Sequence, residues 1–321
     1  MIYTPLKLQP CYKEYLWGGT RLKTEYNKSD APDVTAESWE LADHRDGASV
    51  VAEGQYKGCT LSQLSEHDKT AFWGTDCKRE TFPVMVKLID AQKKLSIQVH
   101  PSDITARAAF GEQGKAEMWY IVDCEPHAGI YYGFSRRITS DEFLRRAQDG
   151  SICEVLNWVP VSKGDVFYIM PGTIHAIGAG IVIAEIQQNS NTTFRVYDYQ
   201  RKGADGKTRP LHLKRAAEVI SFDPIIPEEC KINSGAEFED FSIREMFSCS
   251  YFRAYRVDVH RRIELKCDGC SFQHILCVEG SGQILHEGKQ YPILCGQSYF
   301  MSAALGEYQI IGDCRILLSR V

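Results

Sequence analysis

The chain has 321 residues, of which 44% are apolar and 25% are charged. This composition is typical of a globular protein and excludes the polar, charge-rich class of disordered chains. The 37 basic and 42 acidic residues give a net charge of -5, which argues against a broad nucleic-acid-binding surface.

Neither a targeting segment nor a membrane span is predicted. No apolar run follows Met1, and the longest apolar stretch, 181–186, is interrupted by Glu185. A spanning helix needs about 18 or more apolar residues. The cysteines are scattered, apart from the C-x-x-C pair Cys267 and Cys270, as in a reduced intracellular protein. We therefore expect a cytoplasmic protein without a membrane or nucleic-acid partner.

Few helices are predicted. Capping residues mark the starts of short helices at 60–64 and at 140–147, where Ser140 is the expected N-cap, and a third covers 213–220. Most other segments are predicted strands, because apolar and β-branched runs alternate with Gly, Pro and Asp. These strands are expected at 84–89, 95–100, 118–122, 166–170, 180–187, 193–199, 251–259, 272–279, 282–286, 298–301 and 308–311. Many short strands predict a mainly β fold of the jelly-roll kind.

The polar segment 226–237 interrupts the strand pattern. It predicts a joint between an N-terminal domain, residues 1–235, and a C-terminal β domain, residues 236–321. The length agrees with two domains of roughly 100–200 residues each.

Three segments carry side chains suited to metal binding. Segment 95–100 alternates strictly, so Gln98 and His100 share the polar face of one strand. Glu117 leads into an apolar strand, which is unusual for a carboxylate without a partner. His175 follows a Pro-Gly turn within an apolar run. Each segment alone also fits a simpler interpretation: a solvent-facing polar stripe, an exposed strand end or a core histidine.

Together these residues supply two imidazoles, one carboxylate and one amide. Such a mixed nitrogen and oxygen set suits Zn²⁺, with Mn²⁺, Fe²⁺ or Co²⁺ as substitutes. The set contains no thiolate, which favours a catalytic site with open positions over a closed structural site. From the residues alone, a metal site and a set of unrelated structural residues both stay open.

The segments around these residues resemble the type I mannose-6-phosphate isomerases, in the short bacterial form that lacks an inserted helical domain. The resemblance covers about residues 10 to 215, with a weaker fit beyond. Its motifs are Trp-Gly-Gly-Thr at 17–20, Glu-Ser-Trp-Glu at 37–40, Leu-Ser-Ile-Gln-Val-His-Pro at 95–101, Lys-Ala-Glu-Met-Trp-Tyr at 115–120, Pro-Gly-Thr-Ile-His-Ala at 171–176 and Asn-Ser-Asn-Thr-Thr-Phe-Arg-Val-Tyr-Asp at 189–198. The resemblance implies two stacked cupin jelly rolls with a few short helices, the metal lying in the N-terminal one.

The resemblance also implies roles for single residues. One Zn²⁺ per chain would be held by His100, Glu117 and His175, with Gln98 as a fourth ligand. Arg195 matches the family's catalytic arginine, and Lys115 matches a lysine placed in its active site. Ser96, Lys115 and Arg195 are the expected contacts to a phosphorylated hexose. His274 and His286 form no metal pattern, so the second module is expected to be metal-free.

The implied activity is the interconversion of mannose 6-phosphate and fructose 6-phosphate through an enediol. Asn191 departs from the family, because several relatives carry an acid at this position. Two other interpretations stay open: a non-catalytic sugar-phosphate-binding cupin, which Asn191 favours, and an Fe²⁺-dependent cupin oxygenase, which two histidines and a carboxylate also fit. The sequence does not distinguish a monomer from a homodimer.

Overall fold

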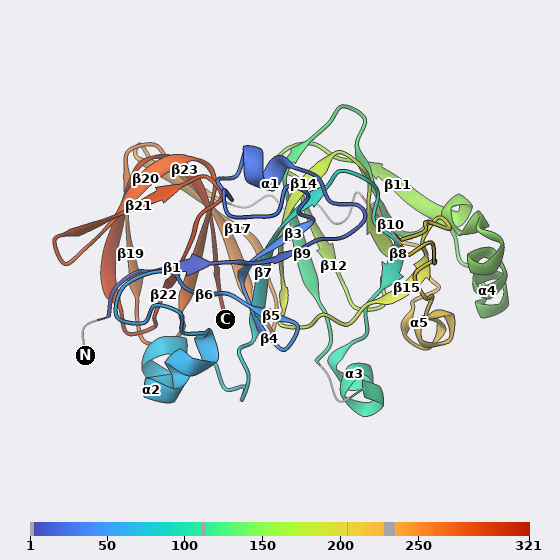
Figure 1. Cartoon of the computed structure of the whole chain (residues 1–321), viewed down its shortest axis with the longest axis horizontal. Helices are drawn as coiled ribbons and strands as arrows, with labels where there is room; N and C mark the ends of the chain where they lie inside the picture. Colours follow the sequence, from blue (N-terminus) through green and yellow to red (C-terminus); the bar gives the residue numbers. More distant parts are fainter. Residues whose placement is uncertain (1–2, 111–112, 204, 228–234) are drawn as a thin grey trace. The chain divides into compact units, whose positions relative to one another are not determined.

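The computed structural model describes residues 3–110, 113–203, 205–227 and 235–321 (Figure 1). The chain packs into two compact units, each contributed by separate stretches of sequence. The first unit comprises Met1–Lys13, Thr20–Leu88 and Ile232–Val321, and the second comprises Glu14–Gly19 and Ile89–Lys231. The N-terminal segment therefore shares a unit with the C-terminal segment. The division into domains 1–235 and 236–321 stays a prediction.

Antiparallel strands build the second unit. Three of them pair in the order β12 (Val166–Ile169), β9 (Glu117–Cys124) and β14 (Ile181–Gln188). Five others form a sheet in the order β11 (Leu156–Pro160), β10 (Gly129–Phe134), β13 (His175–Ile177), β8 (Ile97–Val99) and β15 (Phe194–Tyr197). Every residue of β14 is buried, which explains why residues 181–186 are apolar apart from Glu185 rather than alternating.

Helices α4 (Ser140–Asp149) and α5 (Leu213–Val219) cover one face of the five-stranded sheet (Figure 1). Their apolar residues join one core cluster with Ile97, Val99 and Phe194 of the sheet. Because side chains alternate along a strand, Gln98 and Arg195 point to the opposite face. The helices thereby fix which face of the sheet carries polar side chains.

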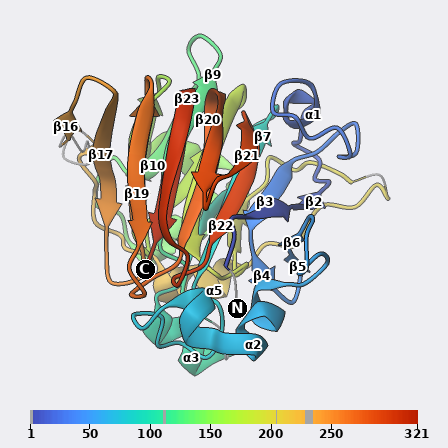
Figure 2. The same ribbon diagram turned by 90° about the vertical axis from the view of Figure 1, so that its left-hand side faces the viewer.

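The first unit is also built mainly of strands. Its main sheet has the order β16 (Ala236–Glu237), β17 (Phe241–Ser248), β18 (Arg253–Val259), β23 (Gly306–Arg320), β20 (Gln273–His286), β22 (Ser298–Met301), β1 (Leu6–Gln9) and β6 (Val50–Val51). Strand β19 (Arg262–Cys267) pairs with β23, and β21 (Lys289–Leu294) pairs with β20 (Figure 2). Strands β2 (Cys11–Lys13) and β3 (Glu37–Leu41) pair with each other, as do β4 (Asp43–His44) and β5 (Gly47–Ala48). The chain leaves this unit within β7 (Val84–Ala91).

Most predicted strands are present, but the separate strands at 272–279 and 282–286 are wrong. They form one long strand, β20, that continues through a bulge between Cys277 and Glu279. Gly280 has a φ of 73°, and a Cβ atom there would collide with the carbonyl of Asp313. A glycine that looks like a strand end in the sequence therefore marks a bulge inside the strand.

The predicted helices are confirmed with different ends. Helix α2 (Leu61–Trp73) starts after Thr60, whose hydroxyl and the side chain of Gln63 form a capping box, but it runs well beyond the predicted 60–64. Helix α4 is capped by Thr139 rather than by Ser140, since the Thr139 hydroxyl accepts the N–H of Glu142. Two further helices were not predicted, α1 (Arg21–Thr24) and α3 (Asp103–Phe110), and Ser151–Val155 forms a short 3-10 helix.

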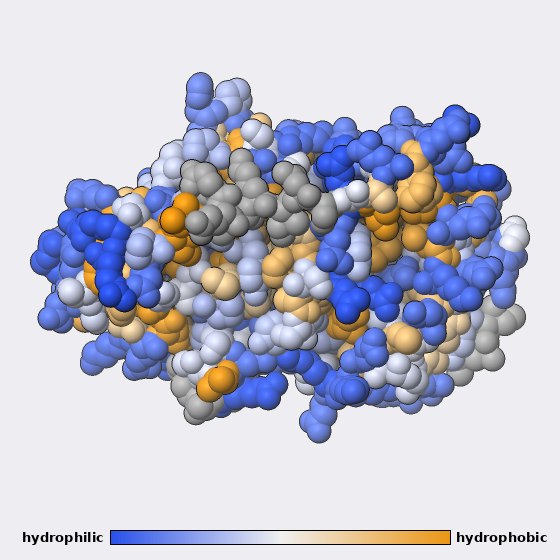
Figure 3. Space-filling model, turned by 180° about the vertical axis from the view of Figure 1, so that it is seen from behind, coloured by the Kyte–Doolittle hydropathy of each residue, from blue (hydrophilic) through white to orange (hydrophobic). Residues whose placement is uncertain are grey.

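The face of the molecule in Figure 3 is mostly hydrophilic, with apolar residues in separate patches. The large apolar side chains with the greatest exposure lie on different elements, among them Ile104 on α3 and Trp158 on β11. Single exposed apolar residues are common and need no binding role. No helix in the part of the chain that the structure describes has the length and apolarity to cross a membrane.

Candidate metal centre

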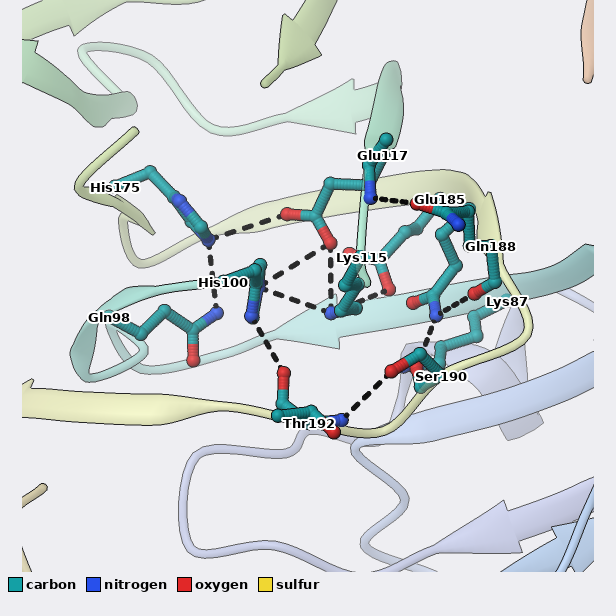
Figure 4. A network of polar contacts seen from close by, with 12 residues as sticks. Lys87, Gln98, His100, Lys115, Glu117, His175, Glu185, Gln188, Ser190 and Thr192 are labelled. Carbon is teal, nitrogen blue, oxygen red and sulfur yellow. Dashed lines mark hydrogen bonds and ion pairs between the residues drawn. The ribbon is translucent and has the colours of Figure 1, made fainter. Parts of the chain in front are cut away.

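His100, Glu117 and His175 lie together in the second unit (Figure 4). His100 directly follows β8, Glu117 begins β9 and His175 begins β13. One ligand atom from each side chain lies within 4.8 Å of the others, and all three side chains are buried. The predicted ligands of three separate segments are therefore brought to one point by the strand pairing.

Backbone carbonyls set the orientation of both imidazoles. Nδ1 of His100 is 2.9 Å from the carbonyl oxygen of Thr192, and Nδ1 of His175 is 2.9 Å from that of Thr173. A carbonyl oxygen only accepts, so each Nδ1 carries the proton and each Nε2 carries a lone pair. Burial lowers the pKa of His175 to about 4, so this ring is neutral at neutral pH.

Both Nε2 atoms face the carboxylate of Glu117. Nε2 of His175 lies 3.3 Å from Oε1, and Nε2 of His100 lies 3.6 Å from Oε2. Two nitrogen lone pairs and a carboxylate thus converge in a buried space, an arrangement that a cation would stabilise. Metal-binding histidines typically donate their other N–H to a carbonyl or carboxylate, as both rings do here. The donor chemistry therefore fits a bound metal ion.

Gln98 lies beside this group. It pairs across the strands with His175 on one side and with Arg195 on the other, so the three side chains share one face of the sheet. Its Nε2 atom is 3.4 Å from Nε2 of His175, which places the amide nitrogen, rather than the oxygen, toward the histidine. Its role as a ligand stays a prediction.

Lys115 brings a positive charge to the same group. Its Nζ atom lies 2.8 Å from Oε2 of Glu117 and 3.3 Å from Nε2 of His100 (Figure 4). The side chain is buried, with a relative exposure of only 5%. A buried ammonium is stable only when paired, and Glu117 provides the partner.

Glu185 and Gln188 of β14 complete the surroundings, and the sequence analysis did not assign them to the site. Oε1 of Glu185 lies 3.9 Å from the ammonium of Lys115, and its Oε2 accepts the indole N–H of Trp119 at 3.0 Å. Gln188 accepts the N–H of Ala116 at 2.9 Å, between Lys115 and Glu117. The sequence did contain a feature that could have indicated Glu185: it is a lone carboxylate in an apolar run, like Glu117.

Ser96 and Arg195, the remaining predicted site residues, lie on or next to the five-stranded sheet. Ser96 is buried directly before β8. Arg195 is on β15, where its guanidinium donates to the carbonyl of Pro210 at 3.0 Å. In the other unit, both ring nitrogens of His286 lie 3.0 Å from backbone carbonyls, and His274 is fully buried. The metal-free state of that module stays a prediction.

Comparisons with known proteins identify the family. The model of the phosphomannose isomerase type I catalytic domain matches residues 6–129, and that of the mannose-6-phosphate isomerase cupin domain matches residues 242–321. The mannose-6-phosphate isomerase ManA of Bacillus subtilis is 39% identical over 100% of both chains. The mannose-6-phosphate isomerase of Streptococcus mutans is 31% identical over 98% of both.

Solved structures agree. The crystal structure of the mannose 6-phosphate isomerase from Bacillus subtilis has a TM-score of 0.91 and 34% identity, covering 99% of this chain and 100% of that one. A phosphomannose isomerase from Salmonella typhimurium has a TM-score of 0.79 at 16% identity, which shows the fold alone. The predicted resemblance and the mainly β fold with a cupin domain are thus confirmed. The chain belongs to the type I mannose-6-phosphate isomerase family.

Proposed function

We propose that this protein is a zinc-dependent aldose–ketose isomerase that interconverts mannose 6-phosphate and fructose 6-phosphate. The observation that carries the proposal is the convergence of His100, Glu117 and His175 beside the ammonium group of Lys115. Membership of the family supports the substrate, since relatives that match over the full chain are named for it. We also infer that it acts in the cytoplasm as a monomer or homodimer.

One Zn²⁺ per chain would be held by His100, Glu117 and His175, with Gln98 as the fourth ligand. When bound, the ion supplies Lewis-acid polarisation of the sugar oxygens. Gln98 would present its Oε1 atom after a rotation of the terminal amide, which exchanges two atoms of similar size. His175 is neutral at neutral pH, which favours its role as a metal ligand, because a metal binds the unprotonated nitrogen.

The reaction moves one proton from C2 of the aldose to C1, and a second proton from the oxygen on C2 to the oxygen on C1. An enediol lies between the two sugars. Negative charge develops on oxygen as the carbon-bound proton leaves, so fixed cations nearby lower the barrier. The guanidinium of Arg195, on the same face of the sheet as Gln98, is the donor we assign to this charge.

Lys115 is the group we assign to substrate contact and proton transfer. It is held by Glu117 in the centre of the site and carries protons that an oxygen can accept. An amide such as Asn191 is too weak a base for this step. A metal-bound imidazole is equally unsuited, because its lone pair is engaged. Ser96, Lys115 and Arg195 are the proposed contacts to the phosphorylated sugar.

The test uses the purified full-length chain, stripped with a chelator and reloaded with Zn²⁺. Formation of fructose 6-phosphate from mannose 6-phosphate is followed for the wild type, His175→Ala and Arg195→Ala. Asp223→Asn is the control, because Asp223 forms an exposed ion pair with Arg137 and neither residue belongs to the proposed site. We expect turnover in the wild type and control, its loss in His175→Ala and in the stripped protein, and a strongly lowered but measurable rate in Arg195→Ala.

A metal-loaded wild type that leaves both sugars unchanged would refute the proposal. Oxygen consumption by the Fe²⁺-loaded protein would instead support the oxygenase interpretation. Binding of mannose 6-phosphate without turnover would support the non-catalytic one.

A further inference from the structure

Asp198 is a buried carboxylate directly after β15, with a relative exposure of 4%. Arg209 grips it with two hydrogen bonds, from Nε to Oδ2 at 2.8 Å and from a terminal nitrogen to Oδ1 at 2.7 Å. Arg201 donates to the same Oδ1 atom. Burial alone would raise the pKa of Asp198, but the hydrogen bonds from the two guanidiniums outweigh it and lower the pKa. Asp198 is therefore ionised at neutral pH.

The segment that Asp198 holds is also the segment that holds Arg195. Pro210, next to Arg209, accepts a hydrogen bond from the Arg195 guanidinium at 3.0 Å. Two residues further on, His212 bonds the backbone of Arg195 in both directions, at 3.1 Å and 2.8 Å. A continuous path of contacts thus leads from the Asp198 carboxylate to the side chain of Arg195.

Charge makes this path necessary. Arg195 is partly buried. Its burial lowers the pKa of its guanidinium, and the positive charge of Arg209 lowers this pKa further. Asp198 acts in the opposite direction and raises it. Without the carboxylate, the repulsion between the charges of Arg195 and Arg209 would be uncompensated in a partly desolvated space. Asp198 is the counter-charge that lets Arg195 remain where it is.

The backbone at Asp198 shows that the turn is held in place. Tyr199 and Gln200, which follow it, both have left-handed conformations, with φ values of 56° and 54°. Two such residues in succession persist only when surrounding contacts fix them. Arg201 supplies them, since it binds Asp198 and donates to the carbonyl of Lys94 at 2.6 Å.

Arg195 keeps donor capacity in this arrangement. One terminal nitrogen is bonded to Pro210, while its buried Nε atom has no hydrogen-bond partner among the described residues. A guanidinium fixed by its backbone and by one nitrogen can direct its remaining donors to a ligand without reorganising.

We propose that Asp198 is a positioning residue for Arg195, acting through Arg209 and Pro210. Asp198 does not touch the sugar in this account. It sets the place of the guanidinium that stabilises the developing oxyanion, so the inference rests on the proposed function.

The first test is a double-mutant cycle with the Zn²⁺-loaded chain. Asp198→Asn keeps the shape of the side chain and removes its charge, and Arg209→Lys breaks the two-bond grip from the other side. We expect each to lower kcat by roughly 10–100-fold in the wild-type background, with KM changed less. In an Arg195→Ala background, we expect Asp198→Asn to have no further effect, since the residue that it positions is gone. Effects that multiply in the double variant would overturn the proposal.

The second test does not depend on turnover. Phenylglyoxal modifies accessible arginines, and its rate at Arg195 can be followed by peptide mass spectrometry. We expect Arg195 to be modified several-fold faster in Asp198→Asn than in the wild type, because its guanidinium is released, with Asp223→Asn unchanged. An unchanged rate at Arg195 in folded Asp198→Asn would overturn the proposal. A wild type without isomerase activity refutes the proposed function instead, and the modification rates still decide the role of Asp198.

Discussion

Nε2 of His175 lies 3.3 Å from Oε1 of Glu117, although the two residues begin different strands, β13 and β9. Neither strand could bring them together alone, because the contact depends on the way the strands of the second unit face one another. The pairing of β13 with β8 adds Gln98 to the same place. The candidate metal centre is thus a product of strand arrangement, and each of its members can be tested separately.

Removal of one ligand should remove the metal. His175→Ala removes one of the four proposed ligands, and Glu117→Gln replaces the anionic ligand by a neutral amide, so we expect zinc affinity to fall by more than about 100-fold in each variant. The measurement is zinc content per chain after dialysis, by elemental mass spectrometry. About one zinc ion per wild-type chain is expected. Full zinc content in both variants would show that the ion lies elsewhere.

Lys115→Met should separate chemistry from metal binding. The methionine side chain has a similar volume but no proton that it can transfer to the substrate, so we expect kcat to fall by roughly 10²–10⁴-fold. The variant also lacks the positive charge that lies beside Glu117 and repels a cation. We therefore expect zinc to bind equally or more tightly. Zinc content and kcat are measured on the same preparation. A variant that loses its zinc would assign Lys115 to the assembly of the site.

Gln188 should act on the site without touching it. Its amide donates to Asp103 at 2.9 Å and accepts from Ala116, and Asp103 also accepts the N–H of Gly114 at 2.8 Å. These bonds fix the backbone between Lys115 and Glu117. We expect Gln188→Met to lower zinc affinity by about 10–100-fold, the usual effect of losing a supporting hydrogen bond near a metal.

The control for Gln188 is Arg107→Ala, which removes the exposed side chain that lies 3.9 Å from Asp103 and leaves the amide bonds intact. Zinc affinity is measured by competition with a fluorescent chelator. Equal losses in the two variants would mean that the effect comes from the stability of α3 rather than from the support of Glu117.

His274 should make the protein sensitive to acid. Burial, with a smaller contribution from the charge of Lys28, lowers its pKa to about 3, and neither ring nitrogen has a hydrogen-bond partner among the described residues. The unfolded chain takes up this proton near pH 6.5, whereas the folded chain does not. The contribution of neutral His274 to the free energy of unfolding is therefore fully present above about pH 6.5 and is lost as the pH drops toward 3.

The expected loss from His274 is on the order of 3 kcal/mol between about pH 6.5 and about pH 4.5. Urea unfolding at a series of pH values measures it. His274→Leu should lower the slope of the pH dependence over this window, because one of the titrating groups is absent. The same slope in the variant and the wild type would assign the acid sensitivity to other groups, such as His175.

The local patterns of the sequence predicted much of the site. Strict alternation in 95–100 places Gln98 and His100 on one face, and the covered apolar residues Ile97 and Val99 confirm it. Lone polar residues in apolar surroundings marked Glu117 and His175. The sequence could indicate these residues because the patterns depend on strand geometry and on the cost of burying charge, and both can be read from neighbours in the sequence.

The supporting contacts could not be predicted in the same way. Gln188 joins Ala116 and Asp103, and Asp198 joins Arg209, through side-chain bonds between segments far apart in sequence. No short spacing encodes such pairs. The turn after β15, with two left-handed residues that are not glycine, also lacks the composition that usually announces one. Helix α3 was missed although the sequence offers a capping residue, Ser102, whose hydroxyl accepts the N–H of Thr105 at 3.4 Å.

The first unit draws on both ends of the chain, since Leu6 of β1 pairs with Phe300 of β22. During synthesis, β1 emerges from the ribosome long before its partner exists. The second unit lies almost wholly within one stretch of sequence and can close while translation continues. The first unit must wait for β22, which makes it the slower to fold and leaves the edge of β1 that pairs with β22 exposed to aggregation in the meantime.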